Sequence, residues 1–579
     1  MDGIEKWNKN EDTTLTGYPS IDKPWLKYYK KEQIEKILPQ CSMYEYVKER
    51  CKEYLENTAF NYFGKKVSYH SLFAGIESAA KSFGAIGIRE GDIVPIISVT
   101  LPEIIYSFYG LNRIGAISNM IDPRTSVAGI RDYIQEVNAK VIIVIDAAYQ
   151  RVVEAAEGTT VERIISVSPA DSLRFPKRQL YRMKKGIKVR RCDLTWEGLL
   201  ALRDDSVDIV HPYKKDECAT IVHTGGTTGM PKGVMLSNDN LNAAAEQALN
   251  SLMPLESKDV FLNVMPPFIA YGIVLGIHTA IAGGWEQVLI PVFDPDKFDD
   301  VILKYRPAAA MGVPTHFDKV ISSKKLVGKD LSYIRCLLVG GDKIRPEFEE
   351  SINSFLFEHG CNLQVSKGYS MTEASSTATF SFGESNKIGS VGIPLPKTIV
   401  AAFDEESGEE KQYNEIGLLH IQTPTMMLGY YGKDEETNQV LIKKADGSKW
   451  IYTGDYGYVD EDGIVFVEGR SKRMLIRYDG FKVFPPLIEK VVEKNCNVQN
   501  SCVVGKKDPE HSQGKLPVVY AVLKENADKE SVKSNLIKLC KEELPEYAQP
   551  TDFIFIEQMP LTPIGKVDYR ALEEKNGEE

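Results

Sequence analysis

Short apolar runs of strand length alternate with helical segments along most of the chain. The run GDIVPIISV (residues 91–99) precedes the helical stretch LPEIIYSFYGLNRIG (101–115), and AKVIIVID (139–146) is a second strand. The same pattern returns at PAAAMGV, which precedes a predicted helix at 314–321, and at IRCLLVGG, which precedes one near Arg345. Strands that are apolar on both faces belong to a sheet covered on both sides. The pattern therefore predicts an α/β fold.

The pattern of the sequence changes after Arg470, and the Gly/Asp-rich stretch YTGDYGYVDEDG (452–463) before it is predicted to form turns and a hairpin. SCVVGKK, VVYAVLK and TDFIFIEQM are predicted strands, and ESVKSNLIKLCKEEL is a predicted helix. A chain of 579 residues exceeds the usual size of one domain. We expect a large N-terminal domain with several sheets at residues 1–469 and a small α+β domain at 470–579.

Composition narrows the class of protein. A net charge of −11 argues against a protein whose main function is to bind nucleic acid. The polar start indicates no secretory signal, and the longest apolar run (266–284), broken by Pro, Gly and His, is predicted to be a buried core helix. Nine scattered cysteines and eight unclustered histidines indicate a reducing cytoplasm and no zinc site.

One stretch, residues 174–191, is strongly basic: RFPKRQLYRMKKGIKVRR. Such a segment could make weak contact with anionic lipid, which would suit a fatty substrate. The commoner interpretation is a solvated surface insertion. Both interpretations remain open at the level of sequence.

A glycine- and threonine-rich loop follows the predicted strand CATIVHT. Glycines let backbone N–H groups approach an anion closely, hydroxyls add donors and a lysine adds charge. The order Pro-Lys-Gly at its end excludes a Walker A loop. We predict a polyphosphate cradle made of Thr224, Gly225, Gly226, Thr227, Thr228, Gly229 and Lys232.

Six further motifs follow this loop in order. They are GYSMTE (368–373), GSVGIPLP (389–396), NEIGLLHIQTPTMMLGYY (414–431), YTGD (452–455), GRSKRMLIRYDGFKV (469–483) and PLTPIGKVDY (560–569). With these seven motifs, the chain resembles the adenylate-forming superfamily, which includes acyl-CoA synthetases, luciferases and peptide-synthetase adenylation domains. The resemblance implies ATP, Mg²⁺ and coenzyme A (as a substrate) as the small molecules involved.

The resemblance also implies roles for residues in these motifs. Tyr369 would stack on adenine, Thr372 would donate to the α-phosphate, and Glu373 would hold Mg²⁺ through its carboxylate. Asp455 and Arg470 would bind the ribose. Further nucleotide contacts are expected from Gly341, Asp342, Gly368 and Ser370.

Lys566, in PIGKVDY, is the expected catalytic lysine, because a mobile positive charge can bridge the substrate carboxylate and the α-phosphate. It lies in the predicted small domain, whereas the phosphate loop lies in the large one, so domain movement is expected. The resemblance places the hinge at Lys472 or Arg473, and places Gly480 beside the pantetheine channel.

The segment MPPFIAYGIVLG resembles the stretch that lines the acyl pocket in this superfamily. No Asp stands there to pair with an α-ammonium group, so an uncharged acid is implied. The expected pocket residues are Ile269, Tyr271, Gly272, Ile273 and Gly340, although plain core packing is an equal alternative for each.

These observations predict an AMP-forming acid–CoA ligase acting on a small-molecule fatty or aryl acid. One alternative is an acyl-adenylating ligase that loads a carrier protein. A stand-alone amino-acid adenylation enzyme is disfavoured by the missing Asp, and a non-catalytic nucleotide-binding scaffold by the retained Lys566, Glu373 and Asp455.

Overall fold

The computed structural model describes residues 15–224, 231–251, 253–342, 344–470, 473–478, 482–511, 514–562 and 567–577. The chain divides into two compact units. The first contains Lys23–Ile399 and Ile421–Ile451, and the second contains Leu15–Asp22, Val400–His420 and the chain from Tyr452 onward. The predicted domain boundary between residues 469 and 470 stays a prediction.

One large sheet of the first unit has eight strands in the order β21-β9-β8-β4-β3-β5-β6-β7. Its strands from β8 to β7 are parallel, whereas β8, β9 and β21 are joined by antiparallel pairs. The apolar runs predicted as strands form β3, β5 and β8, and nearly all of their residues are buried. The bounds are β3 Ile93–Ile97, β4 Ile117–Ile121, β5 Val141–Ile145, β6 Arg163–Val167, β7 Leu194–Thr195, β8 Cys218–His223, β9 Gly233–Ser237 and β21 Gly429–Tyr430.

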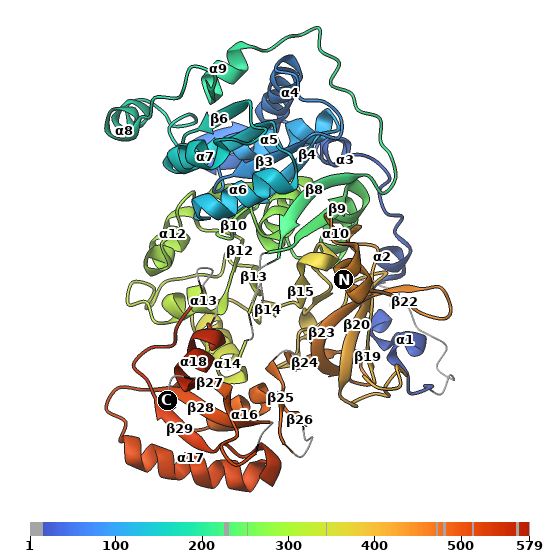
Figure 1. Cartoon of the computed structure of the whole chain (residues 1–579), viewed down its shortest axis with the longest axis vertical. Coiled ribbons are helices and arrows are strands. Elements are labelled where there is room, and N and C mark those ends of the chain that lie inside the picture. Colours follow the sequence, from blue (N-terminus) through green and yellow to red (C-terminus); the bar gives the residue numbers. More distant parts are fainter. Residues whose placement is uncertain are drawn as a thin grey trace. The chain divides into compact units, whose positions relative to one another are not determined.

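Helices cover this sheet (Figure 1). Helix α4 packs against α5, and α6 packs against α7. Their apolar faces, with strand residues, form a continuous buried core. The helices around this sheet are α3 Met43–Arg50, α4 Tyr69–Ala85, α5 Pro102–Arg113, α6 Val127–Glu136, α7 Tyr149–Ala156, α8 Lys177–Lys185 and α9 Trp196–Ala201.

A second sheet of the first unit has seven strands in the order β14-β13-β12-β10-β11-β1-β2. The predicted helix at 314–321 is confirmed as α13, and the one predicted near Arg345 begins at Pro346 as α14. Parallel neighbours joined through such helices are the βαβ arrangement. The bounds are β1 Thr58–Tyr62, β2 Lys65–Ser68, β10 Val260–Asn263, β11 Glu286–Leu289, β12 Ala309–Gly312, β13 Cys336–Val339, β14 Ser366–Lys367, α10 Asn238–Asn250, α12 Phe298–Tyr305, α13 Pro314–Ile321 and α14 Pro346–Glu358.

Within the apolar run at 266–284, residues 271–282 form the predicted buried helix, and most of this helix has π-helical hydrogen bonding. The π-helix spans Tyr271–Thr279 and continues into α11 (Ala280–Ala282). π-Helical segments are uncommon and often lie at functional sites. No helix in the described part of the chain has the length and apolar character needed to cross a bilayer.

The second unit contains a sheet built on strands β19, β20, β23 and β24, and a smaller α+β body. In the body, the strands run in the order β27-β28-β29, and α16, α17 and α18 accompany them (Figure 1). The strands and helix predicted after Arg470 are all present. The bounds are β19 Ile399–Phe403, β20 Gly417–Gln422, β23 Lys449–Val459, β24 Val465–Arg470, α16 Pro485–Val492, β27 Val498–Lys507, β28 Lys515–Leu523, α17 Lys529–Glu543, β29 Asp552–Phe555 and α18 Tyr569–Gly577.

One local expectation is corrected. YTGDYGYV was expected to form turns, but it lies within the long strand β23. Only the residues between β23 and β24 turn, and these two strands form the expected hairpin. The alternation of Tyr and Val with small residues is compatible with a strand, and it outweighs the turn preference of Gly454 and Asp455.

Candidate active site

The predicted phosphate loop connects β8 to β9, and its two ends bind each other. The backbone N–H of Thr224 donates to the Lys232 carbonyl at 3.0 Å, and the Lys232 N–H donates to Thr224 Oγ1 at 3.1 Å. These bonds continue the β8–β9 ladder and hold the loop's ends together. The cradle residues Gly225, Gly226, Thr227, Thr228 and Gly229 lie outside the described residues.

Lys232 lies over an aromatic ring from a distant part of the sequence. Its ammonium nitrogen is 4.6 Å from the ring centroid of Tyr430, a cation–π distance. Tyr430 belongs to β21, which pairs with β9 opposite Val234. The next residue, Tyr431, donates its N–H to the Gly233 carbonyl at 2.8 Å. The pairing of β21 with β9 thus places Tyr430 beside the loop.

The Tyr430 hydroxyl donates to Glu373 Oε1 at 2.6 Å. Burial and then the negative charge of Glu373 raise the pKa of Tyr430 above its usual value, which keeps the hydroxyl protonated as a donor. The Met427 N–H also donates to the Glu373 carbonyl at 2.9 Å. Lys232 and Glu373, predicted from separate motifs, therefore meet on Tyr430, and we call these three residues the Lys232–Tyr430–Glu373 cluster.

The GYSMTE motif is a set of very short strands. Ser370–Met371 (β15) pairs with Ser376–Thr377 (β16), and a single 3₁₀ turn at Thr372–Ala374 joins them. The chain after the motif therefore forms a strand and not a helix. The positive φ angles of Ser375 (51°) and Ser376 (100°) turn the chain back on itself, so a helix cannot continue.

The backbone around Tyr369 is fixed on both sides. Its N–H donates to Thr379 Oγ1 at 3.0 Å, and its carbonyl accepts from the Ala378 N–H at 2.9 Å. A Cβ at the preceding Gly368 would lie 2.7 Å from the Thr379 carbonyl oxygen, so glycine is required for this close approach. The motif thus gives Tyr369 a defined backbone position.

Directly before the motif lies a buried ion pair that the sequence did not indicate. The ammonium of Lys367 contacts the Glu349 carboxylate of α14 and donates to the Lys387 carbonyl at 2.8 Å. Glu349 Oε2 also accepts from the Gly389 N–H at 3.0 Å. The residues are 2% and 1% exposed. Burial lowers the pKa of Lys367, and Glu349 opposes that shift. The pair fastens the GYSMTE and GSVGIPLP motifs to α14.

His223, the last residue of β8, was also missed. Burial lowers its pKa to about 4, because the charged imidazolium is disfavoured there. Nδ1 lies 3.1 Å from the Met120 carbonyl, and the ring packs 4.4 Å from that of Tyr133. Nε2 has no hydrogen-bond partner in the described chain. A neutral histidine therefore precedes the phosphate loop, and only its place beside the loop could have drawn attention to it.

Two of the expected acyl-pocket residues come together. A Cβ at Gly340 would lie 3.4 Å from the Tyr271 hydroxyl oxygen, so this phenol lies against the Gly340 backbone. At Gly272 a Cβ would lie 1.9 Å from the Pro266 carbonyl oxygen, so this π-helical position excludes any side chain. Gly341 has a φ of 80° and Asp342 is exposed.

The two isoleucines of the expected pocket differ in their surroundings. Ile273 is 1% exposed and belongs to the core of the first large sheet. Ile269 is partly buried and packs against both cores of the first unit. Their proposed contact with an acyl chain stays a prediction.

In the second unit, the two expected ribose ligands lie on neighbouring strands. Asp455 of β23 is opposite Arg470 of β24, and Arg470 Nε donates to Asp455 Oδ1 at 3.0 Å. The Asp455 side chain is 4% exposed, whereas that of Arg470 is 60% exposed. The hairpin thus holds a carboxylate and a guanidinium together, with the guanidinium outermost.

Arg473, one of the two expected hinge residues, is anchored in the α+β body. Its guanidinium contacts the Glu489 carboxylate of α16 and donates to the Val503 carbonyl of β27 at 3.2 Å. It also lies 5.5 Å from the ring centroid of Tyr569. Lys472, Gly480 and Lys566 lie outside the described residues.

Comparison with known proteins decides the family. The AMP-binding enzyme family matches residues 47–431, and the AMP-binding enzyme C-terminal domain matches 487–566. The chain belongs to the AMP-binding enzyme family.

Similar members of this family are ligases. A long-chain-fatty-acid–CoA ligase of Bacillus subtilis (strain 168) is 28% identical over 96% of this chain and 98% of its own length. A probable 4-coumarate–CoA ligase 1 of Dictyostelium discoideum is 29% identical over 88% and 91%. The crystal structure of ATP-bound MatB from Rhodopseudomonas palustris is 21% identical, has a TM-score of 0.80 and covers 93% of this chain and 99% of that one. The predicted mixed α/β fold with a small C-terminal domain is thereby confirmed.

A separate group of titratable residues in this AMP-binding enzyme has the spacing of a metal site. Glu90, His211 and Glu217 present ligand atoms within 4.8 Å of one another. The ammonium of Lys214 contacts Glu90 and lies 3.6 Å from Glu217 Oε1, and His211 Nε2 is 2.7 Å from Glu217 Oε2. These carboxylates already have a cation beside them, so Glu373 is the better candidate for holding a metal.

Proposed function

We propose that this chain is an AMP-forming acid–CoA ligase that converts a fatty or aryl acid into its CoA thioester through an acyl-adenylate. The observation that carries the proposal is the Lys232–Tyr430–Glu373 cluster, in which a cation and a carboxylate from separate motifs meet beside the phosphate loop. The similarity to a long-chain-fatty-acid–CoA ligase and a probable 4-coumarate–CoA ligase supports the choice of reaction.

The first half-reaction joins two anions. A carboxylate oxygen of the acid attacks the α-phosphorus of ATP, the bond to the bridging oxygen breaks, and pyrophosphate leaves. Lys232 and the loop donors would hold the phosphates, and Thr372 would donate to the α-phosphate. Glu373 fits Mg²⁺, since Tyr430 fixes one carboxylate oxygen and hard cations take carboxylate ligands. When bound, Mg²⁺ would neutralise phosphate charge.

The remaining nucleotide contacts would come from the other motifs. We assign the adenine and phosphate side to Gly341, Asp342, Gly368, Tyr369 and Ser370, and the ribose hydroxyls to Asp455 and Arg470. Lys566 would neutralise the carboxylate and α-phosphate during the attack. In the second half-reaction, the CoA thiolate attacks the carbonyl carbon and AMP leaves.

Of the two hinge candidates, we assign the rotation to Lys472. Arg473 is bound to Glu489, Val503 and Tyr569 of the α+β body, so turning its own backbone would strain those contacts. A rotation one residue earlier lets the body move with Arg473 attached. Gly480 would then border the pantetheine channel, and the moving domain would begin near residue 470.

The acid is proposed to be uncharged apart from its carboxylate. The Tyr271–Gly340 contact and Ile269 supply a largely apolar wall, with no carboxylate to bind an ammonium group in the segment 266–273.

A panel of carboxylic acids assayed for ATP-dependent pyrophosphate release tests this choice of substrate. Fatty or aryl acids should be the best substrates, and activity confined to amino acids would refute the proposal. Adding CoA or a carrier protein to preformed adenylate identifies the acceptor.

The variant Lys566→Ala tests the catalytic assignment. We expect pyrophosphate release from acid and ATP to fall by about 10³-fold or more, because the lysine stabilises charge only during adenylation. Thioester formation from synthetic acyl-AMP and CoA should survive far better. Lys524→Ala, at an exposed lysine of the same unit, is the control. Equal losses in both half-reactions would contradict the assignment.

A further inference from the structure

Helix α8 (Lys177–Lys185) has the reverse of the usual arrangement of a surface helix. None of its described side chains is buried. Leu180 and Met183, three positions apart, are 54% and 84% exposed. A surface helix normally turns its apolar stripe to the core and its charges to water. The apolar side of α8 instead faces away from the protein.

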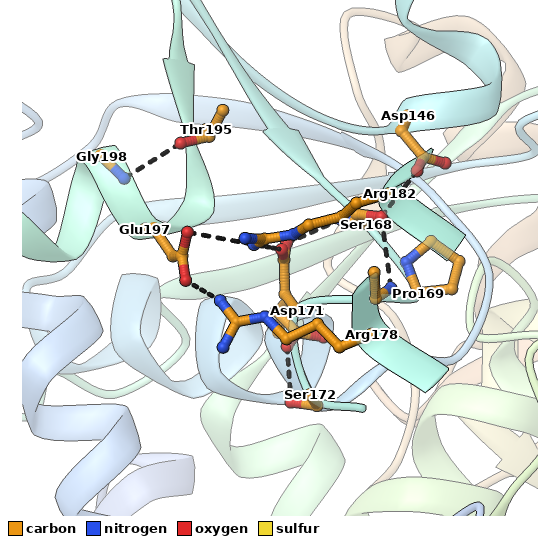
Figure 2. Close-up of polar contacts among 12 residues, drawn as sticks. Asp146, Ser168, Pro169, Asp171, Ser172, Arg178, Arg182, Thr195, Glu197 and Gly198 are labelled. Carbon is orange, nitrogen blue, oxygen red and sulfur yellow. Dashed lines mark hydrogen bonds and ion pairs between the residues drawn. The ribbon is translucent and has the colours of Figure 1, made fainter. Parts of the chain in front are cut away.

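The inner face of α8 is held by polar contacts. Arg178 and Arg182 both bind the Glu197 carboxylate of α9 (Figure 2). The guanidinium of Arg182 lies 3.0 Å from Glu197 Oε2 and 3.2 Å from Asp171 Oδ1. Tyr181, between the two arginines in the sequence, donates to Asp146 Oδ1 at 3.4 Å. Residues spaced in this way share one helix face. The charged face is therefore the attachment face.

The residues of the first unit that hold α8 are themselves fixed by hydrogen bonds. The Ser168 N–H donates to Asp171 Oδ2 at 2.8 Å, and Ser168 Oγ donates to Asp146 Oδ2 at 2.7 Å (Figure 2). Thr195 caps α9, which carries Glu197, by accepting from the Gly198 N–H at 3.1 Å. The carboxylates that receive α8 thus have defined positions, and α8 is presented in a defined orientation.

The exposed apolar surface continues on both sides of α8 and is surrounded by cations. Phe175, before the helix, is 77% exposed, and Ile187, after it, is 39% exposed. Residues 174–191 include nine basic and no acidic residues. Within the described chain, no carboxylate pairs with Lys177, Lys184 or Lys188, which are exposed.

We propose that residues 174–191, the basic segment, dock this protein on a bilayer rich in anionic lipid. Phe175, Leu180 and Met183 enter the boundary between headgroups and acyl chains. The lysines of the outer face contact lipid phosphates. A helix with an apolar face bordered by lysines binds a membrane surface in two ways. Its apolar side chains are buried among the lipids, and its lysines are attracted to anionic headgroups. This inference does not depend on the proposed activity.

A lipid surface fits these observations better than other occupants. Nucleic acid would pair with the cations, but it offers no apolar phase for Leu180 and Met183, and the chain as a whole carries a charge of −11. An acidic protein would need its own apolar groove lined by carboxylates. A bilayer offers a flat anionic layer above a continuous apolar one, which matches a convex helix whose lysines border its apolar side chains.

Vesicle co-sedimentation of the full chain tests the proposal. The protein is mixed with vesicles of phosphatidylcholine alone and of phosphatidylcholine with an equal part of phosphatidylglycerol. We expect at least about tenfold stronger partitioning to the anionic vesicles, and a loss of that preference in high salt. Equal binding to both vesicles, or binding to neither, would overturn the proposal.

Two kinds of variant separate the electrostatic and apolar contributions. Lys177→Glu with Lys184→Glu should lower partitioning to anionic vesicles by about tenfold or more, since each surface lysine contributes about fivefold. Phe175→Ala with Met183→Ala should weaken binding to anionic vesicles by about tenfold. If the reversed charges affect folding, the milder Lys177→Gln with Lys184→Gln replaces them. Unchanged binding of these folded variants would refute the proposal.

Matched control variants lie elsewhere on the surface. Phe357→Ala changes an equally exposed phenylalanine (76%) on α14, and Lys524→Glu with Lys529→Glu reverses two exposed lysines of the second unit. These controls should bind vesicles like the unmodified chain. Two results would assign the basic segment to another occupant: heparin retention without vesicle binding, or a lipid-free dimer that Phe175→Ala dissociates.

Discussion

Positive side chains have opposite surroundings in two parts of the first unit. Beside the GYSMTE motif, Lys367 is 2% exposed, and both Glu349 and a backbone carbonyl satisfy its ammonium. On the outer face of the basic segment, Lys177 and Lys184 are exposed among apolar side chains. A cation with its counter-charge inside the fold positions other residues. A cation without one, set beside exposed apolar side chains, is available to contact a partner outside the chain.

The two regions also differ in what their ion pairs contribute to stability. A buried pair has lost its hydration, so removing one partner leaves an uncompensated charge and is expensive. An exposed pair keeps most of its hydration and is screened by salt, so it contributes little. Glu349→Gln and Arg178→Gln test this difference at its two ends, and two variants of other buried groups lie between them in expected effect.

Glu349→Gln should have the largest effect. It leaves the Lys367 ammonium buried without an anion, which we expect to cost about 3–5 kcal/mol in the free energy of unfolding. Urea unfolding at neutral pH measures this. Because the pair fastens the GYSMTE motif to α14, pyrophosphate release should fall as well. The double variant Glu349→Leu with Lys367→Met removes both charges and should recover much of the stability. A double variant as unstable as the single one would contradict this account.

Glu103→Gln tests a buried charge whose hydrogen-bond donor is a hydroxyl and not a cation. Glu103, on α5, is 1% exposed. Its carboxylate accepts a hydrogen bond at 2.6 Å from the hydroxyl of Ser172, which lies just before the basic segment. Burial raises its pKa from 4.5 to about 7. Between these values the folded chain binds more protons than the unfolded chain, so the free energy of unfolding falls as pH rises through this window.

Glutamine imitates the protonated carboxyl at every pH. The variant should therefore match the unmodified chain near pH 4.5 and exceed its stability above pH 7 by about 3 kcal/mol. Melting temperatures of both proteins, recorded across this range, measure the difference. Glu154→Gln, at an exposed position of α7, is the control for the amide substitution itself. A constant difference at all pH values would show that Glu103 does not titrate in this window.

Tyr430→Phe should have an intermediate effect, confined to activity. It removes the hydroxyl that fixes Glu373 but keeps the ring beneath Lys232. Loss of one hydrogen bond to a charged group costs about 1.5 kcal/mol, so kcat/KM for pyrophosphate release should fall about tenfold and the Mg²⁺ concentration needed should rise. Tyr431→Phe, one residue along, is the control. An unchanged Mg²⁺ requirement in Tyr430→Phe would separate the tyrosine from metal binding.

Regular elements were predictable because their signals are local. The strands β3, β5 and β8 follow from apolar runs, and the helix at 314–321 follows from the alternation of such runs with helical segments. The motifs also predicted that Lys232 and Glu373 act on the same nucleotide, and both residues contact Tyr430. The turn that follows GYSMTE was not predictable, because it depends on positive φ angles at Ser375 and Ser376, where the chain folds back to pair with the motif.

Contacts between residues that are far apart in the chain could not be predicted from the sequence either. Nothing near Lys367 indicates Glu349 of α14, and nothing near Glu373 indicates Tyr430 of β21. Likewise, the basic segment was visible as a run of charge, but its inverted attachment through Arg178 and Arg182 depends on Glu197 of α9. Periodicity predicts a face, and tertiary structure decides which way that face points.

Arg178→Gln should have the smallest effect, and it completes the comparison with Glu349→Gln. Arg178 and its partner Glu197 have side chains 33% and 54% exposed, so both stay hydrated when the pair is broken. We expect a loss of less than about 1 kcal/mol and a melting temperature within about 2 °C of the unmodified protein. Arg182 still binds Glu197, which keeps α8 attached. A loss as large as that of Glu349→Gln would mean that the inner face of α8 stabilises the first unit as a buried pair does, and burial would then not be what separates the two regions.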